Sequence, residues 1–197
     1  MIFFRSFNAP LWDIFAGSLL LLFCSLCYLA WWFVSFNPNS SNPNSSGGSA
    51  GMFYLVAAFI TGVAAIALTS NGIKWLSQDS KGLPVRFILL GSAAVFLILL
   101  LVTAIAFHRP MTSEFLIIHI WTALELSMVA VLYGTGHFGL GRVAILTALV
   151  GIAFVASLIC YTLYYRLDGT ARYWDGMIPL IMDAFVMSVF LGVLAVS

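Results

Sequence analysis

The chain has 197 residues, of which 62% are hydrophobic and only 8% are charged. A soluble domain carries roughly 25% charged residues, so this composition excludes a globule whose whole surface faces water. The net charge of +1 and the lack of a Lys/Arg cluster also argue against a nucleic-acid partner. We therefore expect a polytopic membrane protein whose main partner is the lipid bilayer.

Six stretches are each close to the ~20 apolar residues that a helix needs to cross a bilayer. In chain order they are about 14–36, 52–71, 87–107, 115–134, 143–165 and 176–196. The sequence thus predicts an all-α fold of six transmembrane helices, with residues 1–197 forming one integral membrane domain. Between the first two stretches, the polar segment 37–51 repeats Asn-Pro-Asn-Ser-Ser and is rich in glycine, which predicts a flexible outer loop.

The basic residues of the loops predict the orientation. One side holds Arg5, Lys74, Lys81, Arg86 and Arg142, and the other holds Arg109, Arg166 and Arg172. Cytoplasmic loops carry the excess of Lys and Arg, so we expect both termini in the cytoplasm. The membrane predicted for such a chain is the plasma membrane.

A faint internal repeat relates the last four helices. Glu125 and Gly134 have the same spacing as Asp183 and Gly192, and a shift of 58 positions superposes the two pairs. We interpret the third and fourth helices as a copy of the fifth and sixth. If the first two helices form a third copy, three hairpins surround a pseudo-threefold axis, and the position that matches the acids lies near Thr61. The alternative is that apolar helices resemble one another without a repeat.

The two acids Glu125 and Asp183 are the main candidates for a functional site. Each lies near the middle of an apolar stretch that contains no Lys or Arg, where a carboxylate costs about 2.5–3.5 kcal/mol on insertion scales. We expect the two groups to point towards each other or into one cavity, and the pair to hold a proton at neutral pH. The functional interpretation is a proton or cation site, and the alternative is a pair of structural, hydrogen-bonded acids.

Other residues are assigned to the same pathway by their spacing. Trp121 and Thr122 share a helical face with Glu125. Thr61 belongs to a stripe of small residues that either packs against another helix or lines a narrow path. Pro179, one turn before Asp183, removes a backbone hydrogen bond beside that acid, unless it lies in the first turn of its helix, where proline is tolerated.

The histidines do not form a metal site. His119 and His137 are 18 residues apart, which is about 27 Å along a helix, whereas zinc ligands all lie within roughly 2.3 Å of one metal. The sequence therefore predicts no metal and no cofactor. His119 is a candidate proton relay because histidine titrates near neutral pH.

Aromatic residues gather on the predicted outer side, together with a set of charged and polar residues. That set consists of His108, Arg109, Arg166, Asp168 and Asp175. An aromatic belt at the membrane interface explains most of the aromatic residues. The alternative is that they form, with the charged and polar set, an outer vestibule for an organic solute.

The favoured function is a membrane transporter for a small solute or cation, coupled to protons, or a substrate-binding membrane subunit. The first alternative is an intramembrane enzyme on a lipid or isoprenoid substrate, with the two acids as general acid and base. The second is a structural or accessory subunit of a membrane complex, or a homo-oligomer. The chain lacks the HExxH motif, so no catalytic residue is assigned and an enzyme is the less favoured interpretation.

Overall fold

The computed structural model describes residues 8–37, 48–79, 85–106 and 113–196. Six α-helices account for almost all of them. Their bounds are α1 Ala9–Phe36, α2 Gly48–Asp79, α3 Val85–Ala106, α4 Ser113–Gly134, α5 Leu140–Tyr164 and α6 Gly169–Ala195. Each contains a span that is long and apolar enough to cross a membrane, so the predicted all-α, six-span membrane architecture is confirmed.

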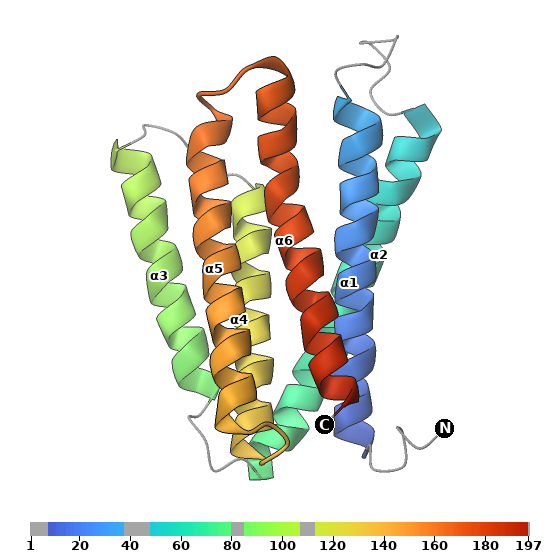
Figure 1. Ribbon diagram of the computed structural model, residues 1–197, viewed down its shortest axis with the longest axis vertical. Coiled ribbons are helices and arrows are strands. Elements are labelled where there is room, and N and C mark those ends of the chain that lie inside the picture. The colour runs from blue at the N-terminus through green and yellow to red at the C-terminus, as the bar shows by residue number, and fades with distance from the viewer. Residues whose placement is uncertain (1–7, 38–47, 80–84, 107–112, 197) are drawn as a thin grey trace.

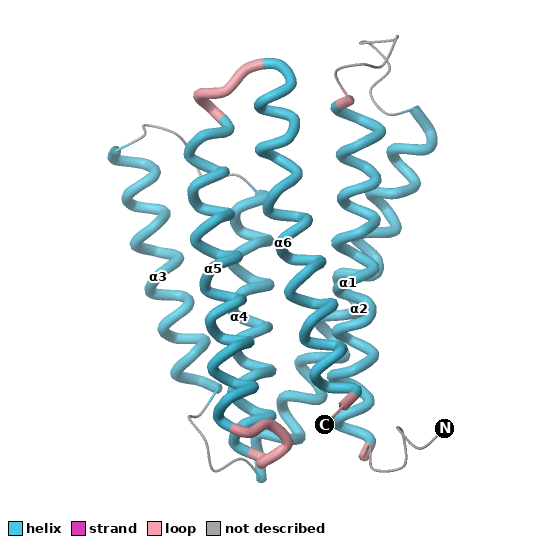
Figure 2. The backbone as a smooth tube through the Cα atoms, viewed as in Figure 1, coloured by secondary structure: helices cyan, strands magenta, loops and turns pink. Residues whose placement is uncertain are grey.

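The helices run roughly alongside one another in a bundle (Figure 1). We call the end at which α1 begins and α6 ends the proximal end, and the opposite end the distal end. The connection between α4 and α5 lies at the proximal end, and the connection between α5 and α6 lies at the distal end (Figure 2). Large apolar side chains cover the outside, including Phe59, Leu90 and Ile105, as expected where a helix faces lipid and not water.

The helices differ in how much the bundle encloses them. In the most apolar window of α4, 56% of the residues are buried, against 6% for α3. Figure 1 shows α3 at one edge, and its main contact is with α4. Helix α4 therefore forms the interior of the bundle, where a polar side chain must find a partner within the protein.

The hairpin pairs predicted from the repeat are all in contact. Helix α1 packs on α2, α3 on α4, and α5 on α6. Between hairpins, α1 packs on α6 and α4 packs on α5. A threefold axis would also pair α2 with α3, but the described residues show no comparably extensive contact between these two helices. The pseudo-threefold arrangement is not confirmed and stays a prediction.

Several helices are longer than the apolar stretches that predicted them. Helix α2 begins at Gly48 and so includes the last residues of the predicted loop 37–51, and α6 begins at Gly169, well before residue 176. The reason is that apolar length marks only the part of a helix in hydrocarbon, whereas backbone hydrogen bonds continue the helix among polar residues at the interface. As a result, Pro179 lies ten residues into α6 and is an interior proline. The alternative that it lies in the first turn of its helix is therefore wrong.

Helices α1 and α2 approach each other closely through glycine. A Cβ atom on Gly17 would lie 2.5 Å from Cγ2 of Thr69, and one on Gly72 would lie 2.8 Å from the backbone oxygen of Pro10. Ala65 and Thr69, from the small-residue stripe of α2, are fully buried at this contact. The stripe therefore forms a packing face, as small residues do between membrane helices.

Candidate functional site

The structure brings the two intramembrane acids together in the interior of the bundle. Glu125, on the enclosed helix α4, is 4% exposed, and its Oε1 has no hydrogen-bond partner among the described residues. Asp183, on α6, is partly buried. The two acids line one small cavity, and their carboxyl groups interact with each other. Because a carboxylate can only accept, a hydrogen bond between the two groups would require a proton on one of them.

Helix α1 supplies a third member of this site. The Ser25 hydroxyl, fully buried, lies within hydrogen-bonding distance of Asp183 Oδ2 and also of the backbone oxygen of Leu21. Three helices that are far apart in the sequence thus converge on one polar cluster, which we call the acid pair with Ser25. No Lys, Arg or His of the described residues forms an ion pair with either acid, so a proton is the simplest neutralising group.

A small cavity touches both acids. Its volume is about 20 Å³, which suffices for one water molecule. The lining residues are Ile118, Trp121, Thr122, Glu125, Ala153, Phe154, Ser157, Pro179, Leu180 and Asp183. A water molecule there would lie beside both carboxyl groups.

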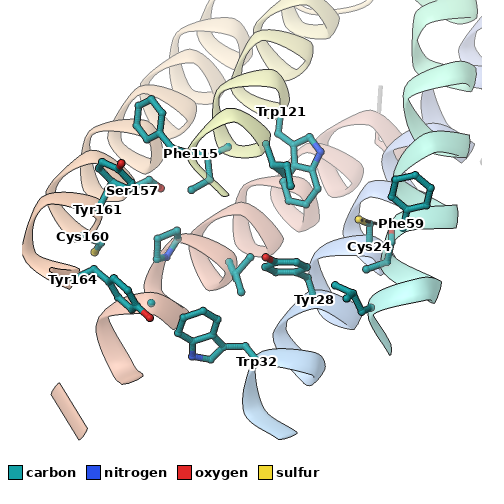
Figure 3. Close-up of a pocket in the computed structure, with 18 of the residues that line it drawn as sticks. Cys24, Tyr28, Trp32, Phe59, Phe115, Trp121, Ser157, Cys160, Tyr161 and Tyr164 are labelled. Atoms are coloured by element: carbon teal, nitrogen blue, oxygen red, sulfur yellow. Dashed lines mark hydrogen bonds between the residues drawn. The ribbon is translucent and has the colours of Figure 1, made fainter. Parts of the chain in front are cut away.

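A much larger cavity occupies the distal half of the bundle. Its volume is about 510 Å³, within the roughly 300–1,000 Å³ typical of small-molecule sites. Side chains from α1, α2, α4, α5 and α6 line it, and most of them are apolar or aromatic. The rings of Tyr28, Trp32, Trp121 and Tyr164 surround the space between these helices (Figure 3).

The two cavities share a wall. Five residues line both of them, namely Ile118, Trp121, Ser157, Pro179 and Leu180. The acid pair therefore lies directly beneath the floor of the distal cavity. A molecule seated on Trp121 and Leu180 would be separated from the acids only by these side chains.

One wall of the distal cavity is fixed by a close packing of tryptophan on glycine. A Cβ atom on Gly176 would lie 2.3 Å from Cζ2 of Trp32, so the indole ring covers α6 at the position where a side chain is absent. The Trp32 Nε1–H donates to the backbone oxygen of Tyr173 over 3.2 Å, and the ring lies 6.0 Å from that of Tyr164, centroid to centroid. These contacts hold Trp32 in one orientation before any ligand binds.

The cavity is not closed towards the outside of the bundle between α2 and α4. Phe59 and Val63 of α2 line the cavity, as does Ile117 of α4, and all three side chains are also exposed. In a membrane this side would face lipid. An apolar molecule could reach the cavity from the bilayer on this side.

The predicted pathway residues divide into two groups. Trp121 and Thr122 line the small cavity beside the acids. Thr61 does not line either cavity, and its hydroxyl donates to the backbone oxygens of Ala57 and Ala58 within its own helix.

His119 faces away from the acid pair. Its Nε2 lies 2.9 Å from Ser92 Oγ and 2.8 Å from Ser92 O on α3. Its ring is packed between Phe96 and Phe154, with centroid distances of 5.3 and 5.7 Å. The structure thus places the histidine at the α3–α4–α5 contact, where it joins α3 to the bundle.

Of the predicted outer vestibule, only Asp175 lines the distal cavity. Arg166 and Asp168 are exposed near the α5–α6 connection. His108 and Arg109 lie outside the described residues. Asp175 is 6% exposed, and its Oδ2 has no hydrogen-bond partner among the described residues.

Sequence reasoning missed Ser25, Ser157 and Cys160. Ser25 gives a weak signal, because it is a hydroxyl residue in the middle of an apolar helix, but the partner of a mid-helix serine is usually its own backbone. Ser157 and Cys160 lie one turn apart on α5 and both line the distal cavity. Nothing in the sequence shows that this face of α5 meets α6 and not lipid.

Within the described ranges, no three His, Cys, Asp or Glu side chains are grouped so that they could hold a metal ion. Comparison with protein-family models, with curated protein sequences and with solved structures finds no match to this chain. The two cavities and the acid pair are therefore the features of this chain that bear on its function.

Proposed function

We propose that this protein is a proton-coupled membrane transporter for a small organic solute, or the substrate-binding membrane subunit of one. The observation that supports this most is the shared wall. A cavity of ligand size lies directly above a buried acid pair, and Trp121, Ser157 and Leu180 belong to both. Intramembrane acids without a basic partner mark ion and substrate pathways in other membrane proteins.

The shared wall supplies a physical link between solute and proton. A solute that fills the distal cavity removes water from above the acids, and a carboxylate that loses water is disfavoured relative to its protonated form. Solute binding and proton binding therefore favour each other. By thermodynamic reciprocity, a lower pH must then strengthen solute binding by the same factor.

The experiment uses the purified protein in lipid nanodiscs and in proteoliposomes. Small organic amines, alcohols and carboxylic acids are screened by thermal unfolding at an acidic and at an alkaline pH. We expect a stabilising solute to raise the midpoint of thermal unfolding more at the acidic pH. We also expect an inward gradient of that solute to move protons into dye-loaded proteoliposomes. Solutes that bind equally at both pH values and move no protons would refute the coupling and leave structural acids as the explanation.

We propose that both termini lie in the cytoplasm and that the membrane is the plasma membrane, from the Lys/Arg bias of the loops. Asp168→Cys and Leu140→Cys test the orientation, because both positions are exposed and lie at opposite ends of the bundle. The native Cys24, Cys27 and Cys160 are buried. A membrane-impermeant maleimide should label Asp168→Cys in intact cells and Leu140→Cys only after permeabilisation. The reverse pattern would invert the orientation.

A second function is favoured by the open side between α2 and α4. An apolar substrate could enter there from the bilayer and meet the acid pair, which would then act as general acid and base on a lipid or isoprenoid. Incubating the proteoliposomes with an isoprenoid lipid and analysing the lipids by mass spectrometry tests this. A product that is formed by the wild type and not by the Glu125→Gln variant would support the enzyme in place of the transporter.

A further inference from the structure

The distal cavity contains one acid that the proton-coupling mechanism does not use. Asp175 lines its wall from α6, in the turn above Pro179 and opposite Cys160 of α5. Its side chain is more than nine-tenths buried, and Oδ2 has no donor among the described residues. A buried acceptor without a donor destabilises the folded protein.

The backbone adds a second acceptor at the same residue. Pro179 has no N–H, so the carbonyl oxygen of Asp175, four residues earlier, lacks its usual helical donor. Both Asp175 and Pro179 line the cavity. The wall thus presents the Asp175 Oδ2, which has no donor among the described residues, in a turn where Pro179 removes one backbone N–H.

No basic side chain of the described residues supplies that donor, and the Cys160 thiol, which lies against the Asp175 carboxyl group, is only a weak donor. Arg172, the nearest arginine along α6, is held by Tyr164, because its Nε donates to the Tyr164 backbone oxygen over 3.1 Å and its guanidinium carbon lies 5.3 Å from the centre of the ring. The described residues show no ion pair between Arg172 and Asp175. The donor that fits the wall is therefore one that a ligand brings.

The remaining walls indicate what the rest of that ligand is. Trp32 and Tyr164 lie beside each other at the distal end of the cavity, and Tyr28 and Trp121 lie deeper in it (Figure 3). The faces of aromatic rings attract cations, most strongly where water is excluded, and the area of the rings favours an apolar body.

We propose that the distal cavity binds a hydrophobic organic ammonium ion, whose N–H groups bond to the Asp175 carboxylate and whose apolar body lies among the aromatic rings. This assigns the class of solute for the proposed transporter and rests on that proposal. Cations fit better than anions here because the carboxyl group of Asp175 faces the cavity.

Three probes that share one aromatic body test the proposal, namely naphthylethylamine, naphthylethanol and naphthylacetate. Their binding to the full-length protein in phosphatidylcholine nanodiscs is measured by equilibrium dialysis, with empty nanodiscs subtracted for partitioning into lipid. A charge-assisted hydrogen bond contributes about 1.5–3 kcal/mol, so we expect the amine to bind at least about tenfold more tightly than the alcohol, and the acetate to bind most weakly.

Asp175→Asn and Asp168→Asn form a matched pair of variants. Both remove one carboxylate near the distal end, but only Asp175 lines the cavity. The preference for the amine over the alcohol should disappear in Asp175→Asn and persist in Asp168→Asn. Thermal unfolding of the ligand-free variants shows whether each is folded, and Asp175→Glu, which keeps the charge, should retain part of the preference.

Three results would overturn the proposal. These are equal binding of amine and alcohol by the wild type, tightest binding of the acetate, and an unchanged amine preference in folded Asp175→Asn. Failure of the proposed transport function gives a different pattern. In that case the Glu125→Gln, Asp183→Asn double variant and the wild type would bind the amine alike, and neither would show a pH-dependent affinity or proton movement.

Discussion

The double variant Glu125→Gln, Asp183→Asn is expected to fold like the wild type and to lose the bound proton completely. Each amide has nearly the shape of the acid that it replaces, and an amide N–H can donate where the wild type needs a shared proton. Without a basic partner in either apolar span, a neutral pair removes the cost of burying charge. We therefore expect the free energy of unfolding to change by no more than about 1 kcal/mol, or to rise.

Infrared spectroscopy measures the lost proton directly. The carbonyl stretching band of a protonated carboxylic acid should be present in the wild type at neutral pH and absent from the double variant. Asp168→Asn is the matched control, because it makes the same chemical change on an exposed residue and should leave the band intact. If the wild type has no such band, or if the double variant retains full solute-driven proton movement, the acid pair is not the proton site.

Ser25→Ala separates the role of the third residue in this cluster. The variant removes the hydroxyl beside Asp183 Oδ2 and leaves the acids themselves unchanged. Hydrogen bonds between membrane helices average about 0.6 kcal/mol in double-mutant cycles, so only a small loss of stability is expected. The infrared band should persist but shift in frequency, because one bond to the carboxyl group is gone.

Gly17→Ala and Gly72→Ala are expected to cause large losses of stability, because the added methyl group would meet backbone atoms of the neighbouring helix. At Gly17 the new Cβ would lie 2.5 Å from Thr69 Cγ2 and 2.9 Å from the Thr69 backbone nitrogen, and at Gly72 it would lie 2.7 Å from Ile14 Cγ1. Backbone atoms cannot rotate away, so α1 and α2 must separate. Overpacking of this kind costs about 1–3 kcal/mol, more than the ~1 kcal/mol gained in helix propensity.

Gly151→Ala is the matched control for both variants. Gly151 lies within α5, and no heavy atom lies within 4 Å of the position that its Cβ would take. The control should therefore show only the gain in helix propensity. Thermal unfolding in nanodiscs, followed by circular dichroism, measures the three variants side by side. A fall of about 2–8 °C is expected for Gly17→Ala and Gly72→Ala, and midpoints equal to that of Gly151→Ala would contradict the close contact of α1 with α2.

The sequence predicted the number of helices and the centre of each because both depend on local composition. A span of apolar residues must satisfy its backbone hydrogen bonds internally, and a helix is the way in which one segment does so. The ends were less predictable. Gly48 and Gly169 lie in polar sequence, yet they begin helices, because at the interface both water and helix can satisfy a backbone amide.

The acid pair shows where sequence reasoning reached the site and where it stopped. Glu125 and Asp183 were identifiable because an acid in an apolar span is costly wherever the helix packs. Their hydroxyl partner was not, since Ser25 resembles any serine that bonds to its own helix. His119 shows the converse, because its chemistry favoured a proton relay, whereas the rotation of α4 turns it towards Ser92 of α3.

By itself, the sequence determined that the chain is a bundle of six membrane helices with two acids that need a neutralising partner. Only the tertiary structure decided that these acids meet, that Ser25 joins them, and that a cavity of about 510 Å³ lies above them with Asp175 in its wall. The physical reason is that the apolar spans have similar composition on every face. No hydrophobic stripe distinguishes the side that faces the bundle from the side that faces lipid, so close packing at residues such as Gly17 and Gly176 fixes how each helix is rotated.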